Sequence, residues 1–302
     1  MAMKANKRVT LEKAQLKWGY IFIAPCIIGL ILFRFGPMIF SLIMSFTDWT
    51  IIQRPNFIGL ENFRRLANDR LVWLSVRVTL HYTLLSVPLV TVSCFFIASL
   101  LNTGVKGISI YRTIFYIPSV VPIVASSALW RFIFDPMFGL MNSILRFFEL
   151  PPQQWIFSQS GVIPGLAIMA VWGSGNAVVI YLAGLQGISK ELYESADLDG
   201  ANSFQRLTRI TIPLMTPIIF FNFIMGTIGA LQTFTQALIM TNGGPANASL
   251  FMSLYIYRTA FTNQNMGYAS AMSWLLFIIV AIFTAIIFKT SKNWVYYETK
   301  VN

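Results

Sequence analysis

Long apolar runs alternate with short polar breaks along almost the whole chain. Six of these runs reach the roughly 20 residues that a helix needs to cross the hydrocarbon core of a bilayer. They cover residues 18–40, 72–101, 111–134, 162–185, 210–231 and 266–288. Prolines inside several runs predict kinks, which neighbouring helices or a watery cavity can accommodate. The pattern therefore predicts an all-α integral membrane protein with six transmembrane helices.

Composition agrees with a membrane protein. Only 11% of the 302 residues are charged and 56% are hydrophobic, whereas soluble domains carry about 25% charged residues. The net charge of +11 could indicate a nucleic-acid-binding protein, but the basic residues are scattered at the ends of the apolar runs rather than gathered together. We therefore expect contact with membrane lipid and none with nucleic acid.

The positions of lysine and arginine predict the orientation of the chain. Basic residues mark the cytoplasmic side of a membrane protein, and they are denser near both termini and in two of the breaks than in the opposite loops. We predict a cytoplasmic arm at 1–17, a single transmembrane domain at 18–288 and a cytoplasmic tail at 289–302. Within the domain we expect an external loop at about 47–71 and a cytoplasmic loop at about 187–209. The protein is thus predicted to be multi-pass with both termini cytoplasmic.

The cytoplasmic loop between the fourth and fifth spans is acidic. Four of the eleven Asp and Glu residues lie between Glu191 and Asp199. Ser189 is a plausible N-cap, and Gly200 can end the helix in the left-handed conformation. Ser203 is then the predicted cap of a second helix that continues into the fifth span. The pattern predicts a helix, a glycine turn and another helix at the inner membrane surface.

The spacing in this loop is similar to that of a known motif. Residues 194–196 read Glu-Ser-Ala, glycine stands at 200, and 210–213 read Ile-Thr-Ile-Pro. This resembles the EAA loop of membrane subunits of binding-protein-dependent ABC importers, with serine for the first alanine and isoleucine for leucine. Segments 111–118, 134–142, 242–245 and 266–271 resemble sugar permeases of the maltose and glycerol-phosphate type. The resemblance implies the type I ABC importer permease fold.

The resemblance also implies roles and partners. The loop would be a coupling helix that docks on an ATPase subunit through Glu194, Ser195, Ala196, Asp197, Gly200 and Ala201. The implied partners are a second permease subunit in a heterodimer, two ATP-binding subunits, an extracytoplasmic solute-binding protein and a sugar, with an oligosaccharide favoured. The implied location is the plasma (inner) membrane of a prokaryote.

Catalysis is not expected in this chain. The sequence contains no G-x-x-x-x-G-K-[ST] phosphate loop, so ATP and Mg are expected to bind to the partner subunits rather than here. Its only histidine, His81, cannot form an H-E-x-x-H metal site, and we interpret it as a packed residue of its span. We expect no metal, no cofactor and no catalytic residue.

Polar side chains in and just beyond spans four and five are candidates for a sugar pathway. They are Asn176, Tyr181, Asn222, Gln232, Thr233 and Gln236. Amides, hydroxyls and aromatic faces suit a neutral or weakly charged sugar. The same side chains also form hydrogen bonds between membrane helices, and both interpretations stay open.

Two other functional classes are weaker. An ion-coupled secondary transporter predicts internal repeats and acidic residues within the spans, but the six runs have no central acid and no strong repeat. An intramembrane enzyme that uses Asp197 and Asp199 with a metal would require a second aspartate-rich loop, which is missing. The leading hypothesis is a non-catalytic permease subunit of an ATP-driven importer of carbohydrate.

Overall fold

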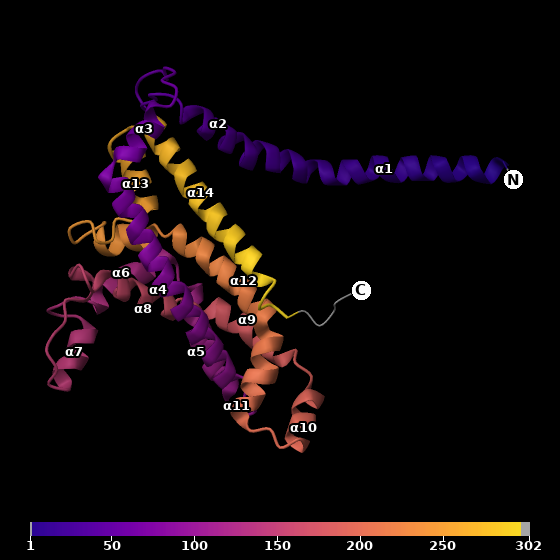
Figure 1. Cartoon of the computed structure of the whole chain (residues 1–302), viewed down its shortest axis with the longest axis vertical. Coiled ribbons are helices and arrows are strands. Elements are labelled where there is room, and N and C mark those ends of the chain that lie inside the picture. Colours follow the sequence, from indigo (N-terminus) through magenta and orange to yellow (C-terminus); the bar gives the residue numbers. More distant parts are fainter. Residues whose placement is uncertain (1, 297–302) are drawn as a thin grey trace. The chain divides into compact units, whose positions relative to one another are not determined.

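The structure is a computed structural model that describes residues 2–296, with side chains from residue 16 onward, and its regular elements are helical (Figure 1). Two compact units are present. The first comprises Met1–Asn68 and Thr259–Trp274, and the second comprises Asp69–Arg258 and Leu275–Asn302. The sites described below lie in the second unit.

The first unit contains a long helix and a folded loop. Helix α1 (Ala2–Leu30) continues through a π-helical turn, η1 (Ile31–Phe35), into α2 (Gly36–Met44). The turn ends two residues before Pro37, whose ring and missing N–H disfavour a regular α-helical turn. The unit also contains α3 (Glu61–Asn68), most of η5 (Arg258–Thr262) and the first turns of α14 (Met266–Ser291).

The loop between α2 and α3 is ordered by specific hydrogen bonds. The buried amide of Asn62 donates to the carbonyl oxygens of Ser45 and Thr47 at 2.9 and 2.8 Å. The backbone N–H of Gly267 donates to the carbonyl of Trp49 at 3.0 Å. These bonds satisfy backbone carbonyls that would otherwise lack partners.

The second unit is a bundle built on one long helix. It contains α4 (Arg70–Leu101), α5 (Ile108–Val120), α6 (Ile123–Ile133), α7 (Leu140–Phe147), η2 (Trp155–Phe157), α8 (Val162–Trp172), α9 (Gly175–Gln186), α10 (Lys190–Leu198), α11 (Ser203–Arg206), η3 (Leu207–Thr211), α12 (Ile212–Leu231), η4 (Ala237–Thr241) and α13 (Met252–Tyr257). Helix α4 packs against α8, α9, α12 and α13. Helix α4 is therefore the central helix of this unit, and the helices that carry the functional residues pack around it.

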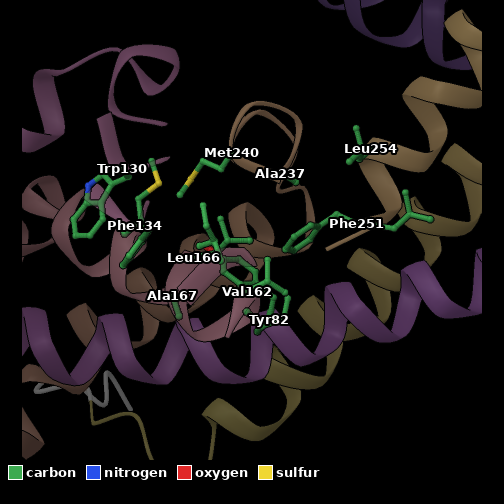
Figure 2. Packing of buried hydrophobic residues seen from close by; sticks show 14 residues of the cluster. Tyr82, Trp130, Phe134, Val162, Leu166, Ala167, Ala237, Met240, Phe251 and Leu254 are labelled. Carbon is green, nitrogen blue, oxygen red and sulfur yellow. The ribbon is translucent and has the colours of Figure 1, made fainter. Parts of the chain in front are cut away.

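Aromatic and aliphatic side chains from distant parts of the sequence form the main core cluster. Figure 2 shows Tyr82 of α4 beside Phe251, with Val162 and Leu166 of α8 close by. The rings of Tyr82 and Phe251 meet edge to face with centroids 5.1 Å apart, a favourable arrangement for aromatic pairs. A second cluster joins α4, α9 and α12 and includes the fully buried Tyr181.

The six predicted spans correspond to four continuous helical segments and two bent pairs. The continuous segments are Leu16–Met44, Arg70–Leu101, Ser203–Leu231 and Met266–Ser291. The bent pairs are α5 with α6, which meet at 102°, and α8 with α9, which meet at 51°. Six spans result if each pair is counted as one. The all-helical fold is thus confirmed, while the third and fourth runs are broken rather than continuous.

The break between α5 and α6 has a local cause. Val121 has an extended conformation, with φ −69° and ψ 129°, as expected for a residue that precedes proline. Pro122 is also extended and then begins the next helix as its N-cap. The chain turns sharply at this dipeptide because neither residue continues the helix.

The prediction that His81 packs inside the bundle was wrong. Its neighbour Tyr82 is 4% exposed and faces the core cluster, whereas His81 is exposed. Successive residues on a helix point about 100° apart, so the burial of Tyr82 turns His81 away from the core.

Candidate functional site

The acidic loop after α9 forms the short helix α10, as its capping residues predict. The hydroxyl of Ser189 accepts a hydrogen bond from the N–H of Glu191 at 3.3 Å and donates to the Glu191 carboxylate. Figure 1 shows α10 and α11 joined by a loop at one end of α12. The acidic residue in the first turn also suits the positive end of the helix dipole.

Gly200 ends α10 through a Schellman motif. It has φ +75°, a left-handed conformation that glycine adopts without steric cost. Its N–H donates to the carbonyl of Asp197 at 3.1 Å, and the N–H of Ala201 donates to the carbonyl of Ala196 at 2.9 Å. The glycine turn predicted at this position is confirmed.

The predicted cap of the second helix was wrong by one residue. Asn202, rather than Ser203, is the N-cap of α11. Its side chain accepts from the N–H of Gln205 at 2.9 Å, and the Gln205 side chain accepts from the N–H of Asn202 at 2.8 Å. This reciprocal capping box satisfies two terminal donors at once, which a serine at 203 would not do.

The predicted docking residues lie around this turn with different exposures. Glu194, Ser195 and Gly200 are exposed, whereas Ala196 and Ala201 are half-buried. Asp197 is exposed but pairs with Arg206 of α11, with Oδ1 to Nη1 at 2.6 Å. Part of its charge is therefore already compensated within the chain.

Two apolar residues on either side of the turn were missed from the sequence. Leu198 is 91% exposed and Phe204 is 71% exposed. Exposed apolar side chains mark contact with a partner or with lipid where they gather into a patch. The sequence indicates them by their position: residues 199–203 are polar or small, and one large apolar residue lies on each side of this segment.

A cavity of about 560 Å³ lies between α4, α9 and α12. Five of the six predicted pathway residues line it: Asn176, Tyr181, Asn222, Thr233 and Gln236. Further polar groups come from Tyr82, Ser86 and Thr91 of α4. Small and apolar residues of α12, including Gly226 and Gly229, complete the wall. The structure thus gathers scattered amides and hydroxyls around one space.

Gln232 is separate from the other five residues. It is the C-cap of α12, it is exposed, and it does not line the cavity. The helix ends at Leu231, so the periodicity that relates Asn222 to the cavity does not extend to Gln232. The interpretation of Gln232 as a pathway residue is therefore not supported by the geometry.

Hydrogen-bonding capacity remains available on the cavity wall. The Asn222 amide donates to the carbonyl of Ile218 within α12 at 3.0 Å, which leaves its carbonyl oxygen open to another donor. The buried hydroxyl of Tyr181 lies near Thr91 but makes no hydrogen bond of ordinary geometry within the described part of the chain. Both atoms therefore keep the capacity for a further hydrogen bond.

A second cavity of about 410 Å³ adjoins the first. It shares Ala170 and Gln236 with the first cavity. Its wall includes Val121 and Gly173, so both helix breaks border this space. Backbone that leaves regular helix within a membrane is tolerated where it lines such a cavity. Among the described residues, no group of three or more His, Cys, Asp and Glu could hold a metal ion.

The sequence matches a known protein family. The family model described as "Binding-protein-dependent transport system inner membrane component" matches residues 80–294. The chain belongs to this family. The predicted resemblance is thereby confirmed, and the protein is a membrane-spanning permease component of a binding-protein-dependent transport system. The family decides against the secondary-transporter hypothesis.

Relatives of this permease support the same assignment along the whole chain. It is 42% identical to the probable ABC transporter permease protein YesP of Bacillus subtilis, over 99% of this chain and 97% of that protein. It is 33% identical to the trehalose/maltose transport system permease protein MalF of Thermococcus litoralis, over 96% and 99% of the two chains.

A solved structure supports the fold of the permease. A chain in the crystal structure of a bacterial alginate ABC transporter, in complex with an alginate pentasaccharide-bound periplasmic protein, matches with a TM-score of 0.82. The match covers 93% of this chain and 96% of that one at 23% sequence identity. The type I ABC importer permease fold expected from the sequence is thus confirmed.

Proposed function

We propose that the chain forms half of the translocation pathway of an ATP-driven carbohydrate importer. The observation that carries this proposal is the polar cavity between α4, α9 and α12, in which Asn176, Tyr181, Asn222, Thr233 and Gln236 come together. Its polar groups are uncharged amides and hydroxyls. Such groups hydrogen-bond sugar hydroxyls without the desolvation cost of burying an ion.

The relatives support the substrate class. Besides the trehalose/maltose permease, they include the lactose permease protein LacF of Rhizobium radiobacter, at 31% identity, and the arabinooligosaccharides permease protein AraP of Bacillus subtilis, at 29% identity. The substrates in these names are all carbohydrates, but they are different sugars. We infer a carbohydrate substrate and favour an oligosaccharide.

The loop from 189 to 213 is proposed to couple transport to ATP hydrolysis in partner subunits. Exposed Glu194 and Ser195 supply polar contacts, and the apolar side chains of Leu198 and Phe204 enter a cleft of the ATPase subunit. Burial of these two side chains would contribute favourable free energy to docking. The chain itself binds neither ATP nor Mg and is not catalytic.

The complete importer is proposed to contain two permease subunits, two ATP-binding subunits and an extracytoplasmic solute-binding protein. One chain supplies one coupling loop, whereas two ATP-binding subunits require two, so a second permease subunit is needed. This arrangement places the loop and both termini of this chain on the cytoplasmic side, in agreement with the distribution of basic residues.

Paired substitutions test the pathway. Asn222→Leu removes a polar group from the cavity, whereas Gln232→Leu makes the same kind of change just outside it. In proteoliposomes that contain the whole complex, we expect Asn222→Leu to slow uptake by about tenfold, the scale of one lost hydrogen bond. Gln232→Leu should leave uptake close to wild type.

Assembly of the complex is the control for this experiment. Both variants should copurify with the partner subunits in wild-type amounts. Equal uptake kinetics for Asn222→Leu and wild type would overturn the role of the cavity. Uptake that stops when the membrane is depolarised while ATP is retained would overturn the proposed energy source.

A further inference from the structure

Tyr193 and Asp197 lie one turn apart on α10 and each contacts the helical segment after the glycine turn. The Tyr193 hydroxyl lies 2.9 Å from Thr211 Oγ1, and the Asp197 carboxylate lies 2.6 Å from Arg206 Nη1. Asp197, the later of the two on α10, thus contacts Arg206, the earlier of the two on the following segment. The two segments therefore run antiparallel, and the two contacts lie one helical turn apart along α10.

The hydrogen bonds close a ring between the two helices. The Thr211 hydroxyl donates to the carbonyl of Arg206 at 3.3 Å. A hydroxyl has a single proton, so when Thr211 donates to Arg206 it accepts from the Tyr193 hydroxyl. The guanidinium of Arg206 then returns to α10 by donating to Asp197. We call Tyr193, Thr211, Arg206 and Asp197 the α10 clamp.

The two contacts of the clamp differ in their exposure to water. The side chains of Asp197 and Arg206 are 54% and 31% exposed, and solvent screens such an ion pair strongly. Thr211 is only 8% exposed. A hydrogen bond at a buried site competes less with water, so the Tyr193–Thr211 contact provides most of the geometric restraint.

The clamp leads directly to the cavity wall. Thr211 is the last residue of η3, and α12 starts at the next position. Asn222, Met225 and Gly226 of α12 line the cavity, and Asn222 is about 16 Å along the helix from Thr211 at 1.5 Å per residue. Movement of a rigidly attached α10 would therefore move this wall.

We propose that the α10 clamp transmits displacement of the coupling helix to α12, and that Tyr193 is a positioning residue for this step. The inference rests on the proposed docking of α10 on an ATPase subunit. Without the tyrosine hydroxyl, α10 pivots about the turn at Gly200. ATP hydrolysis then continues, but less of the movement reaches the cavity.

Tyr193→Phe tests the clamp because it removes only the hydroxyl. Uptake and ATP hydrolysis are measured in the same proteoliposomes, with the complete complex and its binding protein present. The number of molecules transported per ATP should fall by about two- to tenfold, the effect of one hydrogen bond on an equilibrium. Tyr111→Phe is the matched control, because Tyr111 is 56% exposed, lies on α5 and is not part of the clamp.

Substitutions at the partner residue identify the hydroxyl as the cause. Thr211→Val should lower the transport ratio as Tyr193→Phe does, whereas Thr211→Ser should keep it. The double variant Tyr193→Phe/Thr211→Val should be no worse than the more affected single variant, because both remove the same contact. A loss of coupling in Thr211→Ser as large as in Thr211→Val would overturn the role of the hydroxyl.

Copurification with the ATPase subunit separates this inference from the proposal on which it rests. An unchanged transport ratio in an assembled Tyr193→Phe complex would overturn the clamp and leave docking intact. Failure of Tyr193→Phe to assemble would also overturn it, since Tyr193 would then be a docking residue. Failure of the wild-type chain to bind any ATPase subunit would overturn the docking proposal itself.

Discussion

Asn142→Leu is expected to release the loop between α7 and α8. Asn142 is fully buried and uses both ends of its amide. Its Nδ2 donates to the carbonyls of Pro136 and Gln153, each at 2.9 Å. Its Oδ1 accepts from the N–H of Gln153 at 3.0 Å and from the indole N–H of Trp155 at 2.8 Å. One side chain of α7 thus holds the middle of this loop, at Gln153 and Trp155, and the segment before α7, at Pro136.

The magnitude follows from these contacts. A hydrogen bond contributes about 0.5–1.5 kcal/mol net, so the four bonds sum to roughly 2–6 kcal/mol. Leucine has a similar size, so the cavity term is small. Gln153 is exposed and can bond water after the substitution. We therefore expect a loss of about 2–4 kcal/mol in the free energy of opening this loop.

Amide hydrogen exchange measures this free energy directly. A loss of 2–4 kcal/mol accelerates exchange by roughly thirty- to a thousandfold for amides that exchange through local opening. The affected segment should span 135–161, and α4 should remain protected. Gln153→Leu is the matched control, because the backbone of Gln153 makes its bonds to Asn142 whatever the side chain. Equal exchange rates in Asn142→Leu and wild type would refute the reasoning.

Two further substitutions test the packing of the bundle. Gly175→Val should lower the thermal midpoint of the purified protein in detergent by the equivalent of about 1–3 kcal/mol. The reason is that a Cβ at this position would lie 2.5 Å from the carbonyl oxygen of Phe115. Gly104→Val is the control and should change the midpoint less, because a Cβ at position 104 has nothing within 4 Å. Asp69→Ala should lower the stability of the protein by about 1–3 kcal/mol in the same measurement. The Asp69 carboxylate caps α4 and accepts a hydrogen bond from the Tyr255 hydroxyl at 2.8 Å. An unchanged midpoint would contradict this role.

Hydropathy located all six spans but could not predict their shape. The run 111–134 contains Pro118 and Pro122, and only the second breaks the chain into separate helices. Both prolines remove a backbone donor. The difference lies in the backbone of Val121, which is extended. A count of apolar residues does not contain this information.

The candidate pathway residues show the same limit. Gln232 and Gln236 have identical chemistry and lie four positions apart, yet only Gln236 lines the cavity. On a continuous helix this spacing would place both on one face. Here α12 ends at Leu231 and a π-helical segment begins at Ala237. The helical register is lost between them, so side-chain direction cannot be extrapolated from Asn222.

The loop from Ser189 to Thr211 shows what a spaced motif specifies. The position of Gly200 follows from local backbone chemistry, since the Schellman bonds to Ala196 and Asp197 require a left-handed residue there. The same argument does not select Leu198 or Phe204, whose exposed side chains make no contribution to that turn. The glycine spacing therefore determines where α10 ends, but not which side chains around the turn are exposed. Under the proposed docking, recognition by the partner depends on those exposed side chains, while the contacts of Tyr193 with Thr211 and of Asp197 with Arg206 hold α10 to η3 and α11.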